Sequence, residues 1–198
     1  MGTKFTEIYN CFLGKITDDL YMELTPEDTV KDLQHLLVCA IPEFEFPKIN
    51  LSNYTIDTQI KLHEEVQPDE FIIGYIWNDL ETDLISDELT SQLVVVENSY
   101  FEEELTHEEI NILAIIMMGE WVQRQITSIE NTRMKYYGSD FKMTSQANHL
   151  AKLLNLSAEV QRQSLHMQRL YKRRRINEEN GRYESDWDRF RYGTYNAK

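Results

Sequence analysis

Hydrophobic residues run without a polar break through the middle of the chain. The stretch from Thr106 to Gly138 reads THEEINILAIIMMGEWVQRQITSIENTRMKYYG, and every position from Ile112 to Met118 is apolar. A helix that is apolar on all sides has to be buried on all sides. The run is far shorter than the roughly 20 apolar residues of a membrane span, so we expect it to be buried against protein. The pattern predicts a central core helix whose start is capped by Thr106 and Glu109.

A second helix-start signal lies inside this stretch. Thr127 and Glu130 repeat the spacing of a capping box, and hydroxyl side chains such as that of Ser128 compete for backbone hydrogen bonds inside a helix. We therefore predict a bend or break near Ile126. The second helical piece is expected to end at Tyr137, because Gly138 suits the left-handed conformation that terminates helices.

Helical periodicity also precedes the core stretch. Apolar residues at helical spacing predict a short amphipathic helix over residues 6–20, with Gly14 as an interruption. A second helix is expected to start with Thr25 as its N-cap and Pro26 in its first position, and to stop at Pro42.

After the core stretch, apolar and small residues alternate steps of three and four, which predicts a long helix from about Thr144 to Arg175 with a seam that packs on its neighbours. Two of the seam residues are serines, which permit close approach of another helix. The seam residues are Leu150, Leu153, Ser157, Val160, Ser164, Met167 and Tyr171.

Between Pro42 and the core stretch the periodicity changes to that of strands. Polar and apolar residues alternate over 56–62, and two apolar runs follow at 70–77 and 92–96. Residues 97–99 are expected to turn the last run back onto Tyr100 and Phe101, and residues 78–88 to form a mobile loop or a one-turn helix. These features predict a small antiparallel sheet inserted between helices.

Together these elements predict a mainly α fold. We expect a small helical bundle with a long C-terminal helix, a small inserted antiparallel β region over about residues 55–104, and an extended C-terminal arm. Residues 1–175 then form one helical domain and residues 176–198 form the arm. The length of 198 residues and an apolar content of 41% suit one domain with a real core.

Composition points away from metal sites and cofactors. The two cysteines, Cys11 and Cys39, do not have metal-ligand spacing, and we interpret them as small buried groups of a reduced protein rather than a disulfide. The five histidines are scattered, and no glycine-rich phosphate loop, nucleophile elbow or zinc-binding helix motif is present. We expect no catalytic residues, no metal and no cofactor. No signal peptide or membrane span is expected either.

The net charge of −14 is unevenly distributed. Residues 1–109 hold 25 acidic against 5 basic residues, whereas residues 169–198 hold 5 acidic against 9 basic ones. Binding to a nucleic-acid backbone depends on clustered Lys and Arg, so the acidic body is not expected to bind DNA but can surround it. The acidic runs also suit an ordinary solvating surface.

The C-terminal segment is rich in arginine and aromatic residues, the types enriched as anchors of protein interfaces. We predict an arm that becomes ordered on a partner. Two alternatives stay open, in which the segment folds back on its own domain or binds single-stranded nucleic acid through stacking and charge. The candidate partner-binding residues are Arg173, Arg174, Arg175, Arg182, Tyr183, Trp187, Arg189, Phe190, Arg191, Tyr192 and Tyr195.

The order of these features resembles a known family. A short FTEIYNCFLGKITDD opening, a Thr-Pro-Glu-Asp helix that ends at a proline, ELTHEEINILAIIMMGEWVQRQI, and DFKMTSQANHLAKLL before a long helix are similar to head-to-tail connector proteins, also called adaptor or neck proteins, of long-tailed bacteriophages. The similarity spans about residues 3–170. Two departures are a longer, more strand-like middle and a C-terminal arm that matches the family only in general character.

The resemblance implies a structural virion protein and not an enzyme. Such a protein forms a ring of about twelve copies between the portal of the capsid and the tail or stopper proteins, lines the DNA channel without binding DNA specifically, and docks on the portal through its C-terminal arm. It is made in the host cytoplasm and resides in the neck of the virion, with no membrane partner. The alternative function is a nucleic-acid-binding packaging accessory protein that uses the basic tail.

Overall fold

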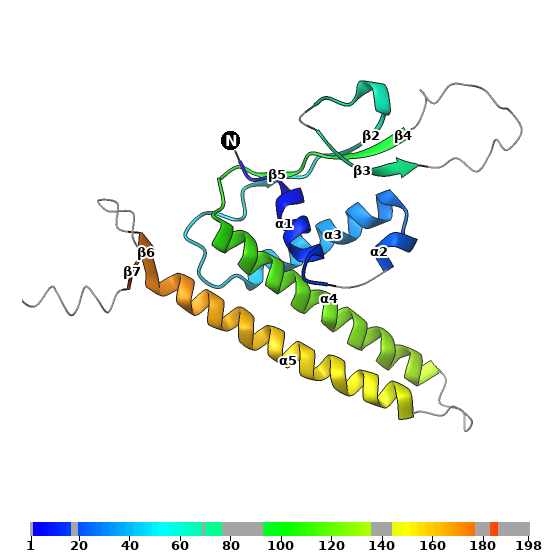
Figure 1. Ribbon diagram of the computed structural model, residues 1–198, viewed down its shortest axis with the longest axis vertical. Helices are drawn as coiled ribbons and strands as arrows, with labels where there is room; N and C mark the ends of the chain where they lie inside the picture. The colour runs from blue at the N-terminus through cyan, green and yellow to red at the C-terminus, as the bar shows by residue number, and fades with distance from the viewer. Residues whose placement is uncertain are drawn as a thin grey trace, which may run out of the picture.

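The structure is a computed structural model that describes residues 2–16, 20–68, 70–76, 93–135, 144–176 and 183–185. It is mainly α, with a small antiparallel β region inserted before the longest helices (Figure 1). Among the described residues, no helix combines the length and the apolar character needed to cross a bilayer.

Three helices and a 3-10 turn form the N-terminal part: α1 (Phe5–Leu13), α2 (Leu20–Glu23), α3 (Pro26–Ala40) and η1 (Ile41–Glu43). The predicted amphipathic helix and its interruption at Gly14 are confirmed, since α1 ends at Leu13 and Gly14 caps it, but the helix does not continue to residue 20. The start of α3 is confirmed. The Thr25 side chain accepts a hydrogen bond from the backbone N–H of Asp28 at 3.2 Å, and Pro26 takes the first helical position.

The β region is built on one antiparallel ribbon. Strands β2 (Thr58–Leu62) and β4 (Leu93–Glu97) pair with each other, and β1 (Tyr54–Thr55) and β5 (Tyr100–Phe101) continue the ribbon in the same register. Strand β3 (Phe71–Ile76) pairs with the other side of β4, so β4 is central. The small antiparallel sheet is confirmed.

The turn predicted at residues 97–99 is wrong. Asn98 donates its backbone N–H to the carbonyl of Asp57 at 2.8 Å, and Asp57 donates its own N–H to the hydroxyl of Ser99 at 2.9 Å. These bonds keep both strands of the ribbon running straight past the gap between β4 and β5. Tyr100 and Phe101 consequently pair with β1 and not with β4. The expected loop over residues 78–88 lies outside the described residues.

Helix α4 (His107–Lys135) is one continuous helix of 29 residues, and the predicted bend near Ile126 is wrong. The Thr127 hydroxyl donates to the carbonyl of Gln123, one turn earlier, at 2.9 Å, so it does not interrupt the helix. The capping box at the start is confirmed, since Thr106 donates its N–H to Glu109 Oε2 at 2.7 Å and Glu109 donates its N–H to Thr106 Oγ1 at 3.3 Å. Gly138 lies outside the described residues.

Helix α4 is the centre of the molecule, as predicted. The helices α1 and α3 pack on one side of it, and α5 (Thr144–Arg173) runs antiparallel along the other side (Figure 1). Residues from Ile112 to Met117 are buried at the junction of these helices. The predicted seam of α5 is confirmed, because its seven residues are all buried or half-buried, although the helix ends at Arg173 rather than Arg175.

Polar contacts join α3 to its neighbours. Arg124 of α4 forms an ion pair with Asp32 of α3. On the sheet side, Gln34 donates to Glu97 Oε2 at 3.0 Å, and Glu97 is fully buried. A buried carboxylate is costly unless donors surround it, so this contact fixes the sheet on α3.

Candidate interface for partner binding

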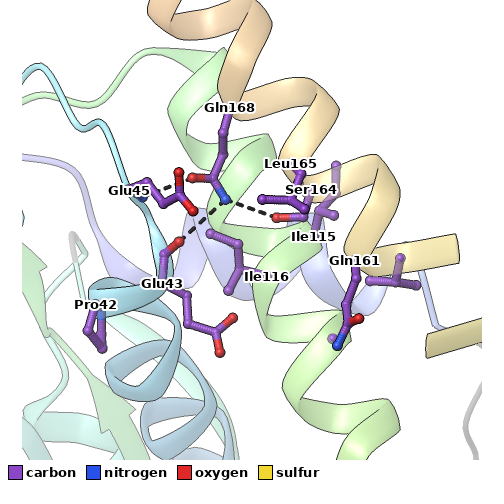
Figure 2. Close-up of a pocket in the computed structure, with 11 residues that line it drawn as sticks. Pro42, Glu43, Glu45, Ile115, Ile116, Gln161, Ser164, Leu165 and Gln168 are labelled. Atoms are coloured by element: carbon purple, nitrogen blue, oxygen red, sulfur yellow. Dashed lines mark hydrogen bonds between the residues drawn. The ribbon is translucent and has the colours of Figure 1, made fainter. Parts of the chain in front are cut away.

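The end of α5, where the predicted arm begins, is held against the rest of the protein by buried polar contacts. Gln168 is only 3% exposed, and its Oε1 accepts the backbone N–H of Glu45 at 2.9 Å. Its Nε2 donates to Ser164 Oγ at 3.1 Å and to the carbonyl of Glu43 at 3.4 Å (Figure 2). One side chain thus attaches α5 to the segment that follows α3.

One turn later, Tyr171 joins three parts of the protein. Its hydroxyl donates to Glu109 Oε1, the oxygen that the capping box leaves free, and its ring packs edge-on against Phe44 with 5.5 Å between centroids. Burial raises the pKa of the Tyr171 hydroxyl, and the hydrogen bond to the Glu109 carboxylate raises it further. The hydroxyl therefore stays a donor throughout the physiological pH range.

The basic residues at this end are partly engaged with the body. Lys172 Nζ lies 3.7 Å from the centroid of the Phe46 ring, a cation–π contact. Arg174 pairs with Glu108 at 3.0 Å, and Glu108 is only 15% exposed. Lys48 donates from Nζ to the carbonyl of Arg174 at 2.7 Å. These contacts fix the direction in which the chain leaves α5.

Four of the predicted partner-binding residues fall within the described residues. Arg173 is exposed at the end of α5, and Arg174 is exposed but pairs with Glu108. Strand β6 (Arg174–Ile176) pairs antiparallel with β7 (Tyr183–Ser185), which places Arg175 opposite Glu184 and brings Tyr183 opposite Ile176. The other seven lie outside the described residues: Arg182, Trp187, Arg189, Phe190, Arg191, Tyr192 and Tyr195.

Sequence reasoning missed a pocket beside this anchored end. It lies between α4, α5 and the segment after α3 and has a volume of about 400 Å³ (Figure 2). The feature of the sequence that could have indicated this pocket is Gly119, a glycine in the interior of a helix with an apolar first half. The lining residues are Pro42, Glu43, Glu45, Ile115, Ile116, Gly119, Val160, Gln161, Ser164, Leu165 and Gln168.

Two carboxyl groups interact beside this pocket. Glu43 shares a side-chain hydrogen bond with Glu120, which directly follows Gly119 on α4. Partial burial of the carboxyl raises the pKa of Glu43, and the hydrogen bond and negative charge of Glu120 raise it further. The pair is therefore a local concentration of negative charge that a cation can neutralise.

Other chemistry is sparse in the part of the chain that the structure describes. Cys11 and Cys39 are both free thiols. Across those residues, no group of three or more His, Cys, Asp or Glu side chains is arranged to hold a metal ion.

Comparison with known proteins gives no match to any protein family, to any curated protein or to any solved structure. The geometry at the end of α5 and the charge distribution are therefore the observations on which function is argued.

Proposed function

We propose that this protein is a structural connector that forms a ring between the portal and the tail of a bacteriophage virion. In this role the acidic body lines a channel through which DNA passes, and the C-terminal arm docks on the portal. The work is done by binding energy at interfaces, with no reaction catalysed. The finer architecture, a small helical bundle that projects an extended arm, belongs to the same proposal.

The observation that supports the proposal is that the end of α5, where the arm begins, is bound to the rest of the protein. Gln168 binds the segment after α3, and Tyr171 and Arg174 both bind the first turn of α4, so the end of α5 is held at the point where the arm leaves. A segment that starts from a fixed point loses less entropy when it binds than one that starts from a loose end. This arrangement supports an arm that docks on a partner.

Charge supports the passage of DNA without binding. The acidic excess lies in residues 1–109, which include α1 to α3 and the β region. Like charge between this surface and the phosphate backbone disfavours adhesion.

Removal of residues 186–198 tests the proposal. This deletion keeps the contacts of Tyr171 and Arg174 and the β6–β7 pair, and it removes most of the arginine-flanked aromatics. We expect the shortened protein to keep its fold and to lose most of its affinity for portal complexes, measured by co-sedimentation. A matched control is Arg162→Ser, which removes an exposed arginine on α5 that pairs only locally with Glu159. Unchanged portal affinity of the shortened protein contradicts the arm hypothesis.

The nucleic-acid-binding alternative makes a different prediction. It requires steeply salt-dependent DNA binding that is lost when Arg173, Arg174 and Arg175 are replaced by Ala. Lys172 and Arg174 already contact Phe46 and Glu108, so part of the positive charge of this cluster is engaged within the protein. We therefore expect no measurable DNA binding at low salt, and steep salt-dependent binding would favour the alternative.

A further inference from the structure

Gly119 has no structural reason to be a glycine. It lies in the interior of α4, where glycine is less stable than alanine because it loses more backbone entropy on folding. A Cβ at this position would lie 3.7 Å from Val160 Cγ1, an ordinary van der Waals contact, so no close approach excludes a side chain. What the glycine does provide is space, because it lines the pocket between α4 and α5.

The pocket combines apolar walls with an acidic end. Ile115, Ile116 and Val160 are buried and line its walls, and Leu165 is 39% exposed. Glu43 and Glu45 line the side formed by the segment after α3 (Figure 2), and the carboxyl group of Glu120 lies close to that of Glu43. Such a site suits an apolar or aromatic side chain with a cationic group beside it, because the cation relieves the repulsion between the two carboxyl groups.

Charge complementarity indicates which segment of the sequence can occupy the pocket. Residues 1–109 carry only 5 basic residues against 25 acidic ones, so the body of another copy would repel the acidic end of the pocket. The C-terminal segment is basic, and at residues 189–192 it places Phe190 between Arg189 and Arg191, with Tyr192 next. This sequence has the aromatic group and the flanking cations that the pocket requires.

We propose that the pocket binds the Arg189–Tyr192 segment of a second copy of this chain. The pocket and the segment are different surfaces, so the contact is head-to-tail, the type that closes into a ring when the rotation between copies allows it. The proposal rests on the ring proposed above and names the contact between neighbours. The other aromatic residues of the arm, Trp187 and Tyr195, remain to bind the portal.

Complementation between two variants tests the contact. Gly119→Leu fills the pocket of one variant, and Phe190→Ser removes the aromatic group from the arm of the other. Each variant alone lacks one half of every contact, so we expect both to sediment as monomers in analytical ultracentrifugation at concentrations where the wild type associates. A mixture in equal amounts contains intact pockets and intact arms on different chains, so we expect it to form dimers and nothing larger.

A labelled peptide of residues 186–198 gives a second measurement that does not depend on self-association. We expect it to bind full-length Phe190→Ser protein in fluorescence anisotropy. Binding is expected to weaken by about tenfold when Glu120→Gln is added, because the cation then loses a charged partner. Gln163→Leu, which places the same leucine side chain on the exposed surface of α5 outside the pocket lining, is the control and should change neither measurement.

The proposal is overturned if the mixture forms no dimers and the peptide does not bind up to its solubility limit. It is also overturned if the wild type associates and Gly119→Leu does not reduce that association, since the contact then lies elsewhere. An arm that docks on its own pocket would give a monomeric wild type although the mixture forms dimers, and that result also contradicts the proposal.

Portal binding of the same variants separates this inference from the connector function. If the variants join portal complexes but the mixed dimers do not form, the proposed contact between copies is wrong and the proposed connector function is still supported. If mixed dimers form but not even the wild type binds portal, the contact stands and the connector is wrong.

Discussion

The Tyr171 hydroxyl, near the end of α5, donates a hydrogen bond to Glu109 Oε1 in the first turn of α4. Glu109 is 2% exposed, and its other oxygen accepts the N–H and the hydroxyl of Thr106. A single buried carboxylate therefore caps the central helix and also fixes the end of the next one. The start of α4 and the end of α5 are therefore joined through one side chain.

Tyr171→Phe tests the strength of this link. The change removes the donor and leaves a buried carboxylate oxygen without one partner, so we expect the free energy of unfolding to fall by about 1–3 kcal/mol. Chemical denaturation followed by circular dichroism measures it. Tyr75→Phe, which removes the hydroxyl of an exposed tyrosine stacked on His63, is the control and should cost less than about 0.5 kcal/mol. Equal effects of the two changes would show that the Glu109 contact contributes little.

Glu43→Gln should make the protein more stable at neutral pH. Burial and Glu120 raise the pKa of Glu43 in the folded state, so the folded protein binds this proton more tightly than the unfolded one. The resulting contribution to stability is present at low pH and is lost as pH rises through the folded pKa. The amide removes this loss of stability, and we expect the free energy of unfolding to rise by about 0.5 kcal/mol at pH 7. The effect is small because solvent partly screens the interaction between Glu43 and Glu120.

The stability gain from Glu43→Gln should shrink as pH falls through the raised pKa of Glu43, because the wild-type carboxyl group becomes neutral like the amide. Thermal unfolding at a series of pH values measures this. Because any lost acid reduces the excess negative charge, the exposed Glu64→Gln serves as the control. A gain that is equally large at pH 4, or equally large in the control, contradicts the assigned cause.

Gly119→Ala should stabilise the protein, in contrast to most core substitutions. Alanine fits beside Val160 at ordinary contact distance and favours the helix, which is worth about 0.5–1 kcal/mol at an interior position. The contrasting change is Gly74→Ala in β3, where the new Cβ would lie 2.8 Å from Pro26 Cγ and should destabilise the protein. Thermal denaturation measures both. A loss of stability in Gly119→Ala would mean that the pocket region tolerates no added atom.

Thr127→Ala distinguishes a continuous α4 from a broken one by the sign of its effect. In a continuous helix, replacing the exposed threonine by alanine should raise the free energy of unfolding by about 0.5 kcal/mol through helix propensity. Loss of the hydrogen bond to the Gln123 carbonyl reduces this gain. If Thr127 capped a second helix, the same change would cost about 1 kcal/mol. Urea denaturation of this variant and of Thr106→Ala, a true cap, should therefore give shifts of opposite sign.

Sequence patterns predicted a structural feature correctly where residues within one short stretch determine that feature. The Thr25 cap, the Thr106–Glu109 capping box and the heptad seam of α5 each depend on residues within one or two turns, and each was predicted. The same reasoning failed at Thr127. Burial of the neighbouring Ile126 against α5 keeps the helix continuous, and the Thr127 hydroxyl binds a backbone carbonyl within that helix.

Non-local contacts decided the rest. Residues 97–99 look like a turn in the sequence. In the structure, Asn98 donates a hydrogen bond to Asp57, and Asp57 donates one to Ser99, and these bonds extend the ribbon instead. The pocket could not be predicted, since its lining comes from three segments spread over more than a hundred positions of the chain. The arginine and aromatic residues of the arm were evident from the sequence alone, but the side chains that anchor the arm's root were not.

The sequence by itself determined the central apolar helix, the small antiparallel sheet inserted between helices, and the division between an acidic N-terminal part and a basic C-terminal segment. These features depend on periodicity, capping and charge, which residues close together in the sequence specify. The tertiary structure decided that α4 is unbroken, that Gln168 and Tyr171 fasten the end of α5, and that Gly119 opens a pocket next to Glu43 and Glu120. These features depend on which distant side chains meet, and only packing around α4 brings them together.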